Sequence, residues 1–459
     1  MASKSSVPQY LQHLTVLEMA GLAPGPLCGQ MFADYGARVI RIDRAKSPAA
    51  ARAENPDTLT RGKQSLALNL KLAEGKAVLA ALLAHPDVNV LVDTYRPGVL
   101  ERIVDLDAVA AARAQAKTAT PLVVVRLTGY GQDSPLAGHD LNYIAKAGLL
   151  SALGTEGTPP MPPINVLGDF ASLALPAFAA VLVALYGHAS DKRASANDSS
   201  SNNDNANAQS EQKVVQIDVN IVESLRYLAQ FVSFARYNTE TAMYRSDAPR
   251  GQNILDGQAC PFYTVYETAN AGEYLSVGAL EPQFYTSFLD FLGFKAGGHN
   301  TTNASPKDTK PIEGIDEVLP NRFDRANWPL LRALFQHRLK QQPLAHWAAR
   351  ASRFPDACVM PVEPLAPPHL IPDAIVTGFG SSTPHGKQPQ SSVGLDASKT
   401  LPPSPGLGGS KRGDTVTGKG QVLAPGTHSY VVLSELLGPC WQENYGPGDY
   451  VYQHKESNL

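Results

Sequence analysis

The first 130 residues of the chain alternate between short apolar runs and helical patterns, and this alternation limits the possible folds more than any other feature. Thr15–Leu17 and Arg38–Ile42 have the apolar and β-branched character of buried strands, and Leu27–Tyr35 between them has a helical pattern. Further strands are expected at 65–70, 88–92 and 122–127, and a further helix at 72–85. Strands that alternate with helices form a parallel sheet with helices on both faces. This half is therefore predicted to be a Rossmann-like α/β domain.

A polar segment interrupts the chain after this half. Residues 188–213 are rich in Ser, Asn, Asp and Gln and cannot bury enough apolar surface to fold, so they are expected to be a disordered insertion. A strand at 214–219 and a long amphipathic helix at 221–237 are expected to follow. The stretches 294–312 and 378–424 are rich in Gly, Pro, Ser and Thr, which predicts surface loops or further disorder.

A different pattern begins near residue 245. Aromatic-rich strand candidates are followed by helical patterns, which predicts a smaller α+β domain over residues 245–355. The expected strands lie at 262–266 and 274–277, and the expected helices at 283–292 and 328–339. The large Rossmann-like domain would then comprise residues 1–238 and 360–459.

Composition limits the partners that the chain can have. With 459 residues and 43% hydrophobic content, the chain is long enough to build two cores. The net charge is −3 and no basic patch stands out, so no nucleic-acid partner is expected. The four cysteines, Cys28, Cys260, Cys358 and Cys440, form no CxxC or CxxH cluster, so neither a metal site nor a disulfide framework is expected.

The longest apolar run, Phe170–Tyr186, raises the question of a membrane span. It is shorter than the roughly 20 residues that cross a bilayer, and it contains Pro176. A buried helix in a soluble protein, without membrane insertion, is therefore expected. Residues 1–12 are polar and contain no apolar core, so no secretory signal is expected either.

Two Gly-flanked turns hold the side chains best suited to catalysis. The segment 138–143 contains His139, and the segment 163–170, about thirty residues later, contains Asp169. An imidazole and a carboxylate on opposite faces of a carbon acid can remove a proton from one side and return it from the other. A His-Asp dipeptide is also common in ordinary turns, so the pair alone decides little. Asp169 directly precedes the apolar run and is expected at a helix N-terminus, where it can cap the helix or lie where the helix end stabilises a developing oxyanion.

Further motifs accompany this pair in a fixed order. They lie at Leu17–Pro26, Arg41–Arg44, Tyr95–Val99, Gly129–Gln132 and Gly278–Tyr285. With these motifs the chain closely resembles the α-methylacyl-CoA racemases of the family III CoA-transferase superfamily. The resemblance runs from about residue 14 to about residue 290, with a weaker match at Asp356–Val362.

The resemblance implies a catalytic role for three residues. His139 and Asp169 would be the acid/base pair, and Glu281 would hydrogen-bond the imidazole, which would fix its tautomer and raise its basicity. Glu281 lies in the expected small domain, so the resemblance implies that it can come from the partner subunit of an interlocked homodimer. Three polar residues match family positions that flank the pair and are expected to support substrate binding: Asp140, Asn165 and Tyr143.

The resemblance also implies which residues hold coenzyme A. Guanidinium groups match the oxygens of a phosphate in charge and in geometry. Arg44 and Arg96 fall at family positions that contact the CoA moiety, and Lys63 lies in the loop near its adenine end. NAD is disfavoured as a ligand, because Gly21–Pro26 lacks the GxGxxG pattern.

The expected activity is that of an isomerase. By resemblance, the substrate is a 2-methyl-branched acyl-CoA whose (2R) and (2S) epimers interconvert through an enolate, and no cofactor is required. Two alternatives stay open: a family III CoA-transferase that uses Asp169 as its nucleophile, and a catalytically silent acyl-CoA-binding protein. His139 favours the racemase, because the transferases do not characteristically carry a histidine at this place.

The last three residues bear on location. Ser457-Asn458-Leu459 is similar to a Ser-Lys-Leu peroxisomal import signal, with an uncharged Asn at the basic position. The N-terminal residues lack the Arg-rich character of a mitochondrial transit peptide. A peroxisomal location is expected, with the mitochondrion or the cytosol as alternatives.

Overall fold

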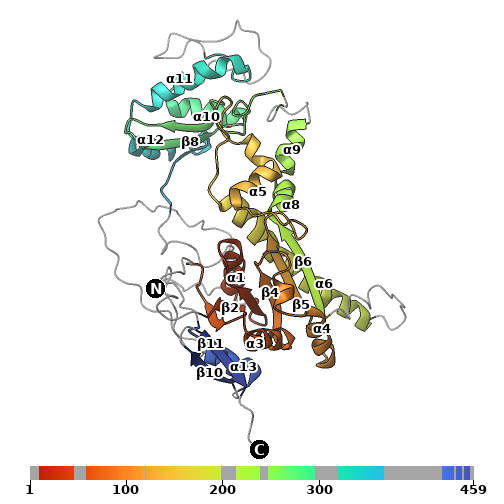
Figure 1. The fold of residues 1–459 in the computed structure, drawn as a ribbon. Helices are drawn as coiled ribbons and strands as arrows, with labels where there is room; N and C mark the ends of the chain where they lie inside the picture. Colours follow the sequence, from red (N-terminus) through yellow and green to blue (C-terminus); the bar gives the residue numbers. More distant parts are fainter. Residues whose placement is uncertain are drawn as a thin grey trace, which may run out of the picture. The chain divides into compact units, whose positions relative to one another are not determined.

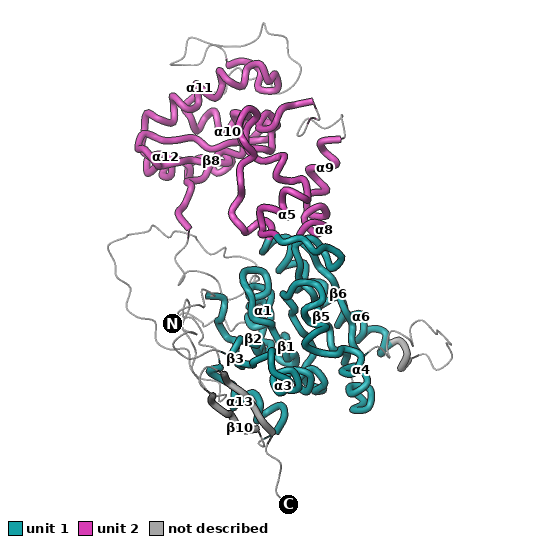
Figure 2. The backbone as a smooth tube through the Cα atoms, viewed as in Figure 1, with its two compact units in different colours: residues 1–137, 169–220, 367–459 teal, residues 138–168, 221–366 magenta. Residues whose placement is uncertain are grey.

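The structure is a computed structural model that forms two compact units (Figures 1 and 2). The first unit comprises residues 1–137, 169–220 and 367–459, and the second comprises residues 138–168 and 221–366. The residues that the structure describes are 10–45, 58–118, 120–197, 213–237, 245, 247–294, 319–365, 426–438, 441–446 and 449–454.

The first unit is built on a six-stranded sheet in which every neighbouring pair is parallel. The strand order is β3-β2-β1-β4-β5-β6. The strands are β1 (Thr15–Met19), β2 (Arg38–Arg44), β3 (Lys63–Leu68), β4 (Val88–Asp93), β5 (Leu122–Thr128) and β6 (Val214–Asn220). This order reverses direction between β1 and β4, as in a Rossmann fold. The predicted Rossmann-like parallel sheet is confirmed.

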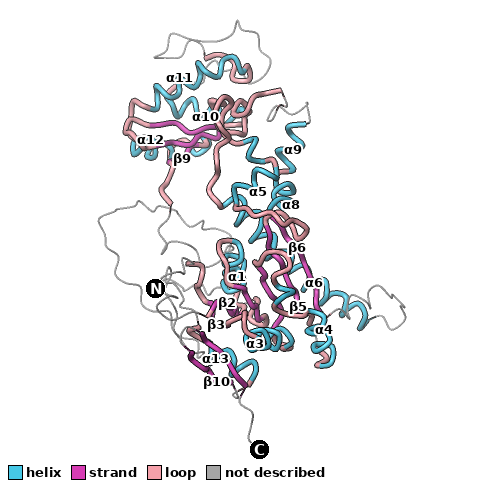
Figure 3. Tube along the Cα trace, in the orientation of Figure 1, coloured by secondary structure: helices cyan, strands magenta, loops and turns pink. Residues whose placement is uncertain are grey.

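Helices cover both faces of this sheet (Figure 3). On one face α1 (Pro24–Asp34) contacts β1, β2 and β4, and α6 (Leu175–Asn197) contacts β5 and β6. The ring of Phe178 joins these two helices, since it lies 4.7 Å from the ring of Phe32. The other face carries α3 (Ala73–Ala84), α4 (Leu106–Gln115) and α13 (Ser429–Leu437).

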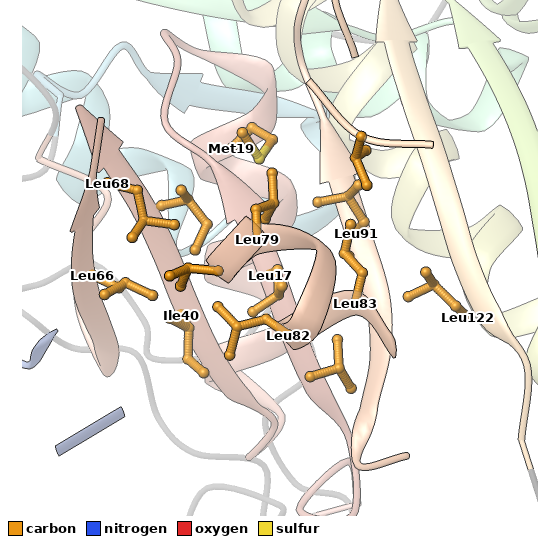
Figure 4. Packing of buried hydrophobic residues seen from close by; sticks show 14 of the residues in the cluster. Leu17, Met19, Ile40, Leu66, Leu68, Leu79, Leu82, Leu83, Leu91 and Leu122 are labelled. Carbon is orange, nitrogen blue, oxygen red and sulfur yellow. The ribbon is translucent and has the colours of Figure 1, made fainter. Parts of the chain in front are cut away.

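The packing of α3 shows why these segments adopt this fold. Leu79, Leu82 and Leu83 recur at helical spacing and are fully buried against the sheet (Figure 4). Leu17 and Ile40 meet them from β1 and β2, because alternate residues of a strand face the same side. Truncating one such leucine to alanine typically costs about 2–5 kcal/mol.

The C-terminal part of the chain returns to the first unit. Just before α13, the backbone N–H of His428 donates to the Ser65 carbonyl at 2.9 Å, and the Ser65 N–H donates to His428 Nδ1 at 3.1 Å. An ion pair of 2.6 Å joins Arg38 to Glu435 of α13. The segment thereby covers the backbone edge of β3, which would otherwise be open to pairing. An antiparallel pair, β10 (Trp441–Gly446) and β11 (Asp449–His454), follows.

The second unit contains a three-stranded antiparallel sheet of order β7-β8-β9. Its core is rich in aromatic rings, with Phe288 and Phe335 at 5.2 Å. The strands are β7 (Tyr263–Glu267), β8 (Tyr274–Gly278) and β9 (Val359–Pro361), and the packed helices are α10 (Pro282–Leu292), α11 (Trp328–Leu339) and α12 (Leu344–Ala351). These elements agree with the α+β character expected for this region.

The compact units do not follow the predicted domain boundaries. The second unit also contains 138–168 and 221–237, which were expected in the large domain. The segment 138–168 contains α5 (Asp140–Ala147). The segment 221–237 forms two helices, α8 (Ile221–Leu228) and α9 (Gln230–Tyr237), in place of the one long helix that was predicted there. Helices α5 and α8 pack together, and Arg226 donates to the Lys146 carbonyl at 3.4 Å. This packing draws both segments out of the sheet unit.

Helix α6 is longer than the predicted start of the disordered insertion allows. It continues to Asn197, so the first part of the segment 188–213 is helical and only 198–212 lie outside the described residues. Extending an existing helix costs little, because each further residue adds a hydrogen bond. The 294–312 and 378–424 predictions also lie outside the described residues, apart from Phe294.

The same helix is less buried than expected. With its preceding turn it spans Val166–Arg193, 28 residues, and 33% of its apolar window is buried. Among the described residues it is the one helix long and apolar enough to cross a membrane by length and composition, a test that core helices also pass. Ala177 and Val181 face the interior, whereas Val183 and Tyr186 are exposed. The helix therefore carries apolar side chains on its exposed side as well as on its buried side.

Candidate active site

The turn that holds His139 is fixed by the start of α5. The backbone N–H of His139 donates to Asn142 Oδ1 at 3.0 Å, and its carbonyl accepts from the Asn142 N–H at 2.8 Å. The Tyr143 hydroxyl donates to the Gly138 carbonyl. His139 itself is exposed. The helix start therefore fixes the backbone of this residue and leaves its side chain accessible to a substrate.

Asp169 lies in the first turn of a π-helical segment, η3 (Val166–Ala174), which leads into α6. The expected helix N-terminus is confirmed, and the first nine residues of the helix are π-helical. Asp169 is half-buried. It belongs to the first unit and His139 to the second, with the division between Gly168 and Asp169. Their pairing across a substrate stays a prediction.

Three more of the expected site residues belong to the second unit with His139. Asp140 is 9% exposed, in contrast to its exposed neighbour His139. Asn165 directly precedes η3 and is exposed, and Tyr143 is half-buried. The helix α5 and the start of η3 therefore gather the polar residues that were expected to flank the pair.

Glu281 is exposed and lies directly before α10. Burial lowers the pKa of Arg322, and the charge of Glu281 acts against this shift, so the carboxylate lies near that guanidinium. Within the described residues of the second unit, no hydrogen bond joins Glu281 to His139. The expected link to the imidazole stays a prediction, as does its origin in a partner subunit.

Arg44 and Arg96 lie at the same edge of the sheet in the first unit. Arg44 ends β2, Arg96 follows the end of β4, and both are exposed. These strands flank β1 on either side, so the two arginines border the point at which the strand order reverses. Ligands of open α/β sheets bind at this point, outside the carboxyl ends of the strands.

The loop between β1 and α1 is pressed against the end of β4. A Cβ atom at Gly21 would lie 2.6 Å from Thr94 Oγ1, and one at Gly25 would also collide with the Thr94 side chain. The glycines therefore allow a close backbone approach at the N-terminus of α1, a type of helix end that can bind a phosphate. The glycines of the motif Leu17–Pro26 thus have a packing role.

Lys63 is not available to a ligand. Its ammonium donates to Glu18 Oε2 at 2.6 Å and to the Pro26 carbonyl at 2.8 Å, and neither side chain of the ion pair is exposed. The expectation that Lys63 contacts the adenine end of CoA is corrected here, because a fully buried and paired ammonium cannot reach a bound molecule. Sequence reasoning missed Glu18, its partner 45 positions away.

Asp93 was also missed by the sequence analysis. It ends β4 next to the Tyr95–Val99 motif, is 3% exposed and accepts a hydrogen bond from the Tyr95 N–H at 2.9 Å. Burial raises its pKa to about 6, against a smaller lowering effect from that hydrogen bond and from Arg126. The signal in the sequence was an acidic residue at the carboxyl end of the apolar run Val90–Val92.

A cavity of about 750 Å³ lies elsewhere in the first unit. Its lining includes Thr15, Arg38 and Asn89, which belong to the starts of β1, β2 and β4, together with His188 and Lys192 of α6. These are the amino ends of the strands. This cavity is therefore separate from the edge that carries Arg44 and Arg96.

The sequence matches the family model of CoA-transferase family III over residues 11–409. The chain belongs to this family. It is 37% identical to the alpha-methylacyl-CoA racemase of Mus musculus and 36% identical to that of Homo sapiens, in each case over 355 residues that make up 77% of this chain and 77% of the relative. The fold is shared with a CAIB/BAIF family protein from Brucella suis, with a TM-score of 0.54 at 19% identity over 75% of this chain and 82% of that one.

Proposed function

We propose that this family III member is an isomerase that interconverts (2R)- and (2S)-2-methylacyl-CoA thioesters. The observation that carries the proposal is the long match to two proteins named alpha-methylacyl-CoA racemase, which spans the turns of His139 and Asp169. The exposed His139 in its fixed turn supports the same chemistry.

In the proposed reaction one of His139 and Asp169 takes the proton from Cα. The electrons of the C–H bond move toward the thioester carbonyl and form an enolate, and the other residue returns a proton to the opposite face of Cα. Both proton transfers are general acid–base steps. Asp169 lies in the first turn of a helix, where the positive end of the helix dipole favours negative charge. No metal or redox cofactor takes part in this proposal.

Arg44 and Arg96 are proposed to bind the phosphate groups of the CoA moiety. Both are exposed and lie at the carboxyl edge of the parallel sheet, on either side of β1. Their planar guanidinium groups can contact two phosphate oxygens at once. Replacing each by Lys should raise the KM for acyl-CoA more than replacing the exposed Arg102, which lies in η1 (Leu100–Arg102).

A second candidate function is CoA transfer, in which the Asp169 carboxylate attacks a donor thioester and forms an acyl anhydride. The name of the family model favours it. The two reactions are separated by incubating the protein with acyl-CoA and hydroxylamine. The racemase proposal predicts no trapped acyl-enzyme and no need for a carboxylate acceptor; an acceptor-dependent exchange of CoA would support transfer in its place.

We also propose that the active protein is a homodimer. Helices α8 and α9 expose the aromatic side chains of Tyr227, Phe231, Phe234 and Tyr237, with exposed fractions of 63–82%. Exposed apolar patches of this kind often mark protein interfaces. A second copy of the chain is the proposed occupant, in line with the shared site implied for Glu281.

A peroxisomal location stays a prediction, since Ser457-Asn458-Leu459 lies outside the described residues. Fusing the last twelve residues to a fluorescent protein tests it. Punctate fluorescence that is lost when Leu459 is removed is expected; a diffuse signal in both fusions would exclude this tail as a sufficient signal.

A further inference from the structure

The carboxylate of Asp140 occupies the space that a side chain at Gly168 would need. A Cβ atom built on Gly168 would lie 2.8 Å from Asp140 Cγ and 3.3 Å from Oδ2, and closer still to Oδ1. Real Cβ atoms do not approach other atoms to less than 3.0 Å. Both residues are buried and both belong to the second unit.

Space, and not backbone conformation, requires glycine at this position. Gly168 is not among the glycines with a positive φ in the described chain. An alanine could therefore adopt its backbone conformation, and the obstacle to alanine is the Asp140 side chain. This separates Gly168 from Gly148, the C-cap of α5, whose φ is 96° and whose Cβ position is open.

The position of this carboxylate is also electrostatically favourable. Gly168 lies in the first turn of η3, at the end of the helix toward which the backbone N–H groups point. A negative side chain at a helix N-terminus interacts favourably with these groups. Asp140 therefore has a physical reason to hold the start of η3.

The chain neighbours of these two residues are the proposed acid/base pair. His139 precedes Asp140 and Asp169 follows Gly168, and consecutive Cα atoms lie about 3.8 Å apart. We propose that Asp140 is a positioning residue that ties the turn of Asp169 to the turn of His139 through its contact with Gly168. The inference rests on the proposed function, because it assigns the contact a role in aligning the two proton-transferring groups.

The test is a double-mutant cycle with Gly168→Ala, Asp140→Ala and the double variant. Rates are read as deuterium incorporation at Cα of a 2-methylacyl-CoA in D₂O, with kcat and KM determined separately and the Tm of each variant recorded. In the wild-type background Gly168→Ala should lower kcat about 10–100-fold, since small misplacements of reacting groups have effects of this order, and should leave KM within about threefold. In the Asp140→Ala background the same methyl group has room, so it should lower kcat by less than about threefold.

Two matched glycine variants serve as controls. Gly187→Ala in α6 meets open space and should leave kcat unchanged. Gly29→Ala would place a Cβ atom 2.8 Å from Glu18 Cδ and should lower the Tm. This decrease in Tm should be the same with and without Asp140→Ala. Asp140→Asn keeps the side-chain volume without the charge and should lower kcat about tenfold or more if the carboxylate holds the helix start.

Several results would overturn the inference. Gly168→Ala with wild-type kcat would do so, as would losses from Gly168→Ala and Asp140→Ala that simply multiply in the double variant. If Gly168→Ala does not fold, Asp140→Asn with wild-type kcat at an unchanged Tm would overturn it instead. The wild-type measurement distinguishes failure of the proposed function from failure of the positioning role. A wild-type protein that exchanges no Cα proton would reject the proposed function. Exchange by the wild type, with effects of Gly168→Ala and Asp140→Ala that do not depend on each other, would reject only the positioning role.

Discussion

Burial decides the role of two charged residues in the first unit more than their sequence motifs do. Lys63 begins strand β3 and Asp93 ends strand β4, and both side chains are almost fully buried. The Lys63 ammonium forms an ion pair with the Glu18 carboxylate. The Asp93 carboxyl group accepts a hydrogen bond from the Tyr95 N–H and interacts with the positive charge of Arg126. The first is a structural ion pair, and the second is a titrating carboxyl group at the ligand edge.

Lys63→Met should destabilise the protein by about 3–5 kcal/mol, because it removes the ammonium group that forms an ion pair with the buried Glu18 carboxylate. Denaturant unfolding measures this loss, and the exposed Lys71→Met is the matched control, with an expected change within about 0.5 kcal/mol. A raised KM for acyl-CoA at unchanged stability would instead restore the ligand role of Lys63.

Asp93 should make stability fall as pH rises. Its pKa is raised from 3.8 to about 6 in the folded state, so folding favours the protonated form, and stability is lost as pH rises from about 4 to 6. The change in the free energy of unfolding caused by Asp93→Asn should therefore be more favourable at pH 8 than at pH 4, by up to about 3 kcal/mol. The exposed Asp87→Asn should show no such difference. Equal effects of Asp93→Asn at both pH values would contradict the raised pKa.

At the scale of single elements, most strands were predictable and some helices were not. Strands β1 to β5 fall within about two residues of their predicted ranges, because each contains apolar and β-branched residues typical of buried strands. Helix α6 extended beyond its apolar run, since polar residues can continue a helix that packing has already formed. The break between α8 and α9 left no signal in the amphipathic pattern of 221–237.

The C-terminal helix α13 should be part of the folding unit of the sheet. Leu433 is 1% exposed and packs in the core cluster with β3 and α3, so Leu433→Ala should lower the free energy of unfolding by about 2–5 kcal/mol. Tyr430 on the same helix is 62% exposed, and Tyr430→Ala should have little effect. Similar small losses from both variants would mean that α13 does not contribute to this core.

At the scale of the whole molecule, the family and the parallel sheet were predictable, whereas the division into units was not. The motif of His139 and Asp169, taken together with the five motifs that accompany it, was sufficient for the family, because each motif is local in sequence. The transfer of 138–168 and 221–237 to the second unit depends on packing of α5 against α8, some 80 residues apart. The burial of Lys63 depends likewise on a distant partner. Tertiary contacts of this kind leave no local pattern.

The proposed dimer is tested through the exposed aromatic residues of α9. Phe231→Ser with Phe234→Ser should shift the mass in light scattering from dimer toward monomer, because both rings would lose their apolar partner surface. Tyr10→Ser, also at an exposed ring, is the control and should leave the mass unchanged. A wild-type protein that is monomeric and fully active would contradict the shared site.

The central claim is that His139 and Asp169 move the α-proton between the two faces of Cα. The most direct measurement follows pure (2R)-2-methylacyl-CoA in D₂O by NMR, with deuterium content at Cα and chirality read in the same sample, for several acyl chain lengths. The wild-type protein should yield both epimers with deuterium at Cα, and His139→Gln should lower the rate about 100-fold or more. Retention of the α-proton by every substrate, or a near-wild-type rate in His139→Gln, would contradict the claim.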